Sequence, residues 1–74
     1  AFHHAEKWRD RIVDEGLPAV QDFLAHCGCE DPGLTALARE LNGSPDDAGR
    51  KRLKRQVFRS VNSLLSTRMQ NNTS

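Results

Sequence analysis

The sequence predicts an all-α protein, a compact four-helix bundle whose last helix is long, amphipathic and basic. Apolar residues recur at spacings of three and four, and no useful length of chain alternates apolar and polar residues with period two. Glycine and proline divide the chain into four segments. With 74 residues, the chain has material for one hydrophobic core. We expect a single helical domain over residues 1–70, followed by a polar, disordered tail at residues 71–74.

Glycine and proline mark the first two predicted helices. A first helix over residues 5–15 ends at Gly16. Pro18 then suits the first turn of a second helix, where its missing N–H costs nothing. The second helix ends at Gly28, because glycine readily takes the left-handed conformation that closes a helix.

The last two predicted helices begin at capping residues. Asp31 followed by Pro32 is typical of an N-cap and a first helical residue, and this third helix closes at residues 42–43. Ser44 is expected to cap the fourth helix by accepting from backbone N–H groups, with Pro45 at the first helical position. The fourth helix then continues without glycine or proline beyond residue 49.

The apolar faces of the four helices are expected to form one small core. Its predicted members are Trp8, Ile12, Val20, Phe23, Leu24, Leu34, Leu37, Leu41, Leu53, Val57, Phe58, Val61, Leu64 and Leu65. The aromatic residues are thereby assigned to the core.

A formal net charge of +1 conceals a strong asymmetry along the chain. Residues 1–49 carry four basic and ten acidic side chains, a net charge of −6, whereas residues 50–74 carry seven basic side chains and no acid. Most of these cations lie on the outer face of the fourth predicted helix. The candidate binding residues are Arg50, Lys51, Arg52, Lys54, Arg55 and Arg59.

Three interpretations of this basic face are open. It binds the acidic surface or helical peptide of a protein partner, it binds the phosphates of DNA or RNA, or it is only solvated and partly neutralised by the acidic half. With the aromatic residues in the core, a stacking platform for single strands is not expected. Arg50 and Lys54 fall inside the apolar arc, so the N-terminal end of this helix projects from the bundle or these side chains reach past a neighbour.

Catalysis and metal binding find little support in the sequence. Cys27 and Cys29 have a Cys-x-Cys spacing, whereas structural zinc prefers Cys-x₂-Cys, so we expect no metal and no cofactor. Candidate nucleophiles such as Ser60 have no histidine placed to activate them, and no catalytic motif is present. We therefore do not expect an enzyme.

The sequence thus predicts a non-enzymatic protein–protein interaction module, one domain of a larger intracellular regulatory or nuclear protein. Nucleic-acid binding through the last helix is the alternative, and a secreted or processed factor is the third hypothesis. A weak homodimer is among the open partners. No membrane partner is expected, because no apolar run approaches the ~18 residues that span a bilayer. A nuclear location is preferred to a cytoplasmic one, because residues 51–54 match a short nuclear-import pattern and the cysteines suit a reducing compartment.

Overall fold

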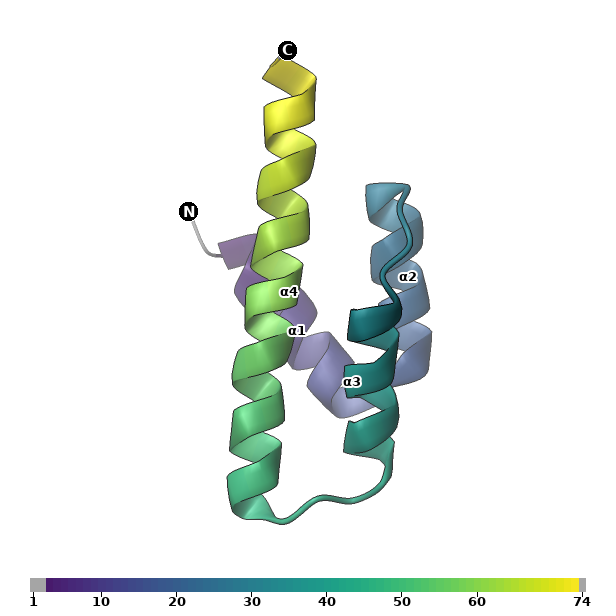
Figure 1. Cartoon of the computed structure of the whole chain (residues 1–74), viewed down its shortest axis with the longest axis vertical. Helices are drawn as coiled ribbons and strands as arrows, with labels where there is room; N and C mark the ends of the chain where they lie inside the picture. The colour runs from purple at the N-terminus through teal and green to yellow at the C-terminus, as the bar shows by residue number, and fades with distance from the viewer. Residues whose placement is uncertain (1–2, 74) are drawn as a thin grey trace.

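A computed structural model describes the backbone of residues 3–73 and the side chains of residues 3–67. Within these limits the chain is all-α and contains no strand, which confirms the predicted fold class. The described residues form four helices, which pack into one bundle (Figure 1). The helices are α1 (His3–Glu15), α2 (Leu17–Cys27), α3 (Pro32–Asn42) and α4 (Asp47–Thr73).

The predicted helix ends at Gly28 and Asp31 are confirmed by their hydrogen bonds. Gly28 has φ 65° and ψ 38°, and its N–H donates to the Ala25 carbonyl at 3.2 Å. The Asp31 carboxylate accepts from the backbone N–H groups of Gly33 at 3.0 Å and Leu34 at 3.2 Å. Because the two caps lie close together in the sequence, the connection between α2 and α3 is short.

The predicted start of the fourth helix is wrong by two residues. Ser44 makes no cap and has φ 59°, whereas an N-cap residue needs an extended backbone. Asp46 caps α4 instead, because its Oδ1 accepts from the backbone N–H of Gly49 at 2.8 Å. Pro45 consequently lies in the connection before the helix.

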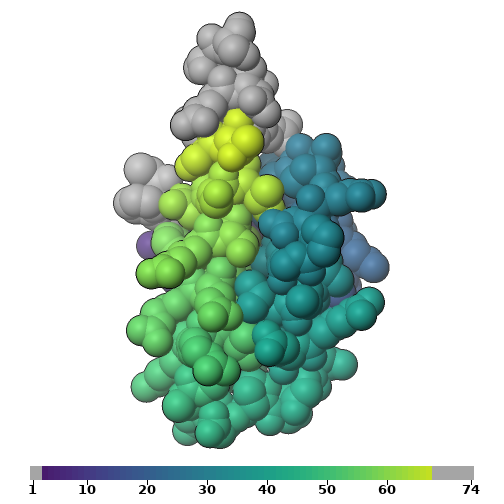
Figure 2. Space-filling model, viewed as in Figure 1, coloured from purple at the N-terminus to yellow at the C-terminus, as the bar shows by residue number. Residues whose placement is uncertain are grey.

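The core lies where α1, α2 and α3 enclose one face of α4. It consists of Ala5, Ile12, Ala19, Val20, Phe23, Leu34, Ala38, Leu41, Leu53, Val57 and Val61. Alanine is small enough to let helix backbones approach closely, which explains why three alanines are buried here. In the space-filling view the side chains of α3 and α4 meet along the visible face (Figure 2).

Six predicted core residues are only half-buried and pack against the rim of the core. They are Trp8, Leu24, Leu37, Phe58, Leu64 and Leu65. Phe58 was predicted to be part of the core but lies at its rim. Phe23 is the aromatic residue that is fully buried in the core. The Trp8 ring lies 5.2 Å from that of Phe23, between α1 and α2.

The C-terminal turns of α4, not its N-terminal end, extend beyond the other helices (Figure 1). The prediction that the N-terminal end of the last helix, with Arg50 and Lys54, projects from the bundle is therefore wrong. The N-terminal end of α4 lies level with the end of α3, to which a short connection joins it. Helix α4 includes residues 71–73 of the predicted tail, and Ser74 lies outside the described residues.

Replacing Phe23 by alanine should lower the free energy of unfolding by about 3–5 kcal/mol, because it opens a cavity in a fully buried position. Phe58→Ala should cost less, about 1–2 kcal/mol, because part of the ring already contacts solvent. Urea denaturation followed by circular dichroism measures both. Equal losses for the two variants would show that Phe58 is as buried as Phe23.

Asp46→Ala should lower the free energy of unfolding by about 1 kcal/mol, because the Gly49 N–H loses its acceptor. Ser44→Ala is the matched control and should change it by less than about 0.5 kcal/mol. The same denaturation experiment compares them. A larger loss for Ser44→Ala would assign the cap to Ser44 after all.

Candidate binding surface

The buried and exposed positions of α4 separate its apolar and basic side chains. Leu53, Val57 and Val61 are spaced four residues apart and are at most 3% exposed, so this stripe faces the bundle. Successive residues of a helix point about 100° apart, which turns the intervening cations outward. All six predicted site residues are accordingly exposed.

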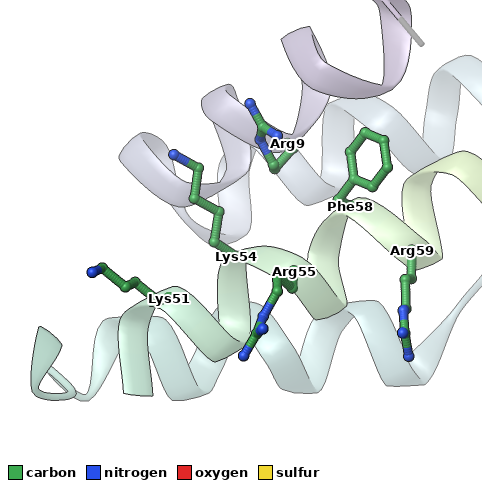
Figure 3. A pocket seen from close by; sticks show the side chains of 6 residues that line it. All are labelled: Arg9, Lys51, Lys54, Arg55, Phe58 and Arg59. Carbon is green, nitrogen blue, oxygen red and sulfur yellow. The ribbon is translucent and has the colours of Figure 1, made fainter. Parts of the chain in front are cut away.

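Four of the six predicted residues meet in a groove of about 540 Å³ between α1 and α4. Figure 3 shows the side chains that line it. They are Arg9, Lys51, Lys54, Arg55, Phe58 and Arg59. The groove is therefore lined by five cationic side chains and one aromatic ring.

The other two predicted residues lie elsewhere on α4. Arg52 lines a smaller recess of about 240 Å³ on the outer side of the helix, together with Arg55, Gln56 and Arg59. Arg50 lines a recess of about 230 Å³ that also contains Asp14 and Glu15. The predicted basic face is therefore divided into a groove side, an outer side and one cation beside acidic residues.

Sequence reasoning missed two residues of the groove, Arg9 and Phe58. The guanidinium carbon of Arg9 lies 5.6 Å from the centre of the Phe58 ring, a cation–π contact between α1 and α4. Arg9 is more than forty residues from the basic run, so only the packing of α1 on α4 reveals it. The sequence does contain a signal that Phe58 belongs to the groove, since this residue falls between Arg55 and Arg59.

The acidic half of the chain forms its ion pairs within α1 and α2, and not with α4. Arg9 pairs with Asp10 at 2.9 Å, and Arg11 pairs with Glu15 at 3.2 Å and Asp22 at 2.9 Å. Among residues 3–67, none of the basic side chains of α4 forms an ion pair. The groove cations of α4 thus lack a carboxylate contact in the described part of the protein, whereas Arg9 of α1 has one.

Arg11 shows what such pairing does on the opposite side of α1. Hydrogen bonds to Glu15 and to Asp22 raise the pKa of its guanidinium above the ordinary value. Its guanidinium carbon also lies 5.0 Å from the centre of the Trp8 ring. Arg11 therefore joins α1 to α2, whereas Arg9 faces α4.

The two helices that form the groove each carry a row of charged residues. Lys51, Arg55 and Arg59 are spaced four residues apart on α4 and form the basic row. Glu6, Asp10 and Asp14 have the same spacing on α1 and form the acidic row, and all three are exposed. Because Asp10 pairs with Arg9 of the groove, the acidic row lies immediately beside it.

Within the described residues, no group of three or more histidine, cysteine or acidic side chains is placed to hold a metal ion. Cys27 and Cys29 are both half-buried near the end of α2. None of the helices, over the residues described, is long and apolar enough to cross a membrane.

Fold and surface together define this chain as a small four-helix bundle with a charged groove between its first and last helices. No protein-family model matches the chain, and no curated protein or solved structure is significantly similar to it.

Proposed function

We propose that this chain is a non-enzymatic interaction module that binds an acidic segment of a partner protein in the groove between α1 and α4. The observation that supports this proposal best is the set of five cationic side chains that line the groove together with Phe58. The α4 members of this set form no ion pair among the described residues, so their charge is available to an anionic partner.

The chemistry of the groove suits a peptide with both acidic and apolar side chains. Arginine guanidinium groups bind carboxylates through two parallel hydrogen bonds, which favours aspartate and glutamate. The half-buried Phe58 ring offers a contact for one apolar side chain, the kind of central anchor that contributes much of the affinity at interfaces. A volume of about 540 Å³ holds a few side chains of such a segment.

The acidic row favours a protein partner over a nucleic-acid duplex at this groove. A duplex carries one negative charge for about every 1.7 Å of its axis. Phosphates laid along the groove would therefore approach Glu6, Asp10 and Asp14 as well as the cations. A peptide can place its carboxylates on the basic side alone.

Nucleic-acid binding remains a second candidate, for which the outer side of α4 is the relevant surface. Arg52, Arg55 and Arg59 line a shared recess there, and their side chains are exposed. Cations spaced along a helix are suited to phosphate contacts. A nuclear, intracellular setting within a larger regulatory protein is part of our proposal and is based on the sequence alone.

The two candidates differ in the cation on which each depends. Lys54 lines the groove but not the outer recess, whereas Arg52 lines the outer recess but not the groove. Fluorescence anisotropy with a labelled peptide rich in glutamate and containing one central leucine measures binding to the groove. Lys54→Glu should weaken peptide binding about tenfold, and the matched variant Arg52→Glu by less than about threefold.

The same titration with labelled DNA and RNA tests the second candidate. Strong binding to nucleic acid that falls steeply with salt, together with a larger loss for Arg52→Glu than for Lys54→Glu, would overturn the proposal in favour of nucleic acid. Peptide binding that neither variant weakens would place the partner on a different surface.

A further inference from the structure

The acidic row and the basic row match each other in spacing. Each consists of three residues four positions apart, and four residues of helix rise about 6 Å. All six side chains are exposed. A surface that carries two rows of opposite charge with equal spacing can pair with another copy of itself.

The order of the two rows along the groove follows from two contacts. Asp14 shares a recess with Arg50, so the end of α1 lies beside the start of α4. Arg9, further back along α1, lies over Phe58. Helix α1 therefore runs opposite to α4 at the groove, as Figure 3 also shows.

The antiparallel arrangement pairs the rows position by position. Asp14 lies near Arg50, the residue before Lys51, and because the helices are antiparallel the remaining acidic residues follow in the same direction as the remaining cations. Each acidic residue of the row on α1 therefore has a counterpart in the basic row on α4 at about the same height along the groove.

We propose that two copies of the chain associate through this groove as a symmetric dimer, with the two-fold axis along the groove. Rotation about such an axis exchanges the two sides of the groove while keeping positions along it. The acidic row of each copy then faces the basic row of the other, and the pairing occurs twice. The two Phe58 rings approach each other near the axis.

The symmetry also excludes the alternative face-to-face arrangement. A two-fold axis across the groove would place acidic row against acidic row and basic row against basic row. Like charges placed opposite each other are repulsive, so this dimer is disfavoured. The contact along the groove is rich in charge and holds one aromatic ring per copy, which makes the dimer weak and sensitive to salt.

The dimer covers the groove that the proposed function assigns to an acidic partner. Self-association and partner binding therefore exclude each other, and only this consequence rests on the proposed function. A high local concentration of the chain favours the dimer. An acidic partner that binds the monomer shifts the equilibrium away from the dimer.

Reversal of each row separately tests the dimer. Sedimentation equilibrium should show the natural chain moving from its mass of 8.3 kDa toward twice that value as concentration rises at low salt. The acidic-row variant Glu6→Lys/Asp14→Lys and the basic-row variant Lys51→Glu/Arg55→Glu should each stay monomeric. An equimolar mixture of the two should recover the dimer, because each row again faces its opposite.

Control variants distinguish loss of association from loss of folding. Circular dichroism checks each variant, and the milder Glu6→Gln/Asp14→Asn should still weaken association at least fivefold. Arg39→Glu/Glu40→Lys reverses an exposed pair on α3, outside the groove, and should leave association unchanged. A natural chain that is monomeric at millimolar concentration, or a mixture that does not associate, would overturn the proposal.

The acidic-row variant also separates this inference from the proposed function. It should still bind the glutamate-rich peptide, because the cations of the groove are intact. A chain that binds the peptide through Lys54 yet never dimerises would contradict the dimer alone. A chain that dimerises as described but binds no acidic peptide would contradict the proposed function alone.

Discussion

The packing of one stripe of α4 against the other helices determines the rest of this structure. Leu53, Val57 and Val61 must all face the bundle, because there is no other apolar surface on which the described part of α4 can be buried. Once that stripe is fixed, the rotation of α4 about its axis is fixed, and its cations can only point outward or along the seam with α1. The basic groove is therefore a direct consequence of core packing.

The α4 cations of the groove stay unpaired among the described residues because the acidic residues that form ion pairs do so with arginines of α1. Asp10, Glu15 and Asp22 pair with arginines of α1, two of them on the side that faces α2. Like charges close together raise the free energy of the isolated molecule, and an anionic partner relieves that repulsion. Arg9 limits the cost at the groove by lying over the Phe58 ring, which attracts a cation. The fold thus gathers cationic side chains along the seam between α1 and α4.

The sequence predicted the four helices and most of the groove cations, but not how they are grouped. Caps at Gly28 and Asp31 were recognisable because each depends on residues next to it in the chain. The choice between Ser44 and Asp46 was not, because it depends on the path of the connection between α3 and α4. Arg9, and the separation of Arg50 from the other cations, depend on which helix packs beside α4. The half-buried state of Phe58 has the same origin, since periodicity gives its side of the helix but not the depth of cover.

We propose that this protein binds its partner in the groove between α1 and α4. The most direct test is a titration of the isotope-labelled chain with the glutamate-rich peptide, followed by two-dimensional NMR. We expect the largest shifts at the backbone amides of residues 51–59 and of Arg9, with α3 little affected. Shifts centred on α2 and α3, with the amide signals of the groove residues unchanged, would show that the peptide does not bind in the groove.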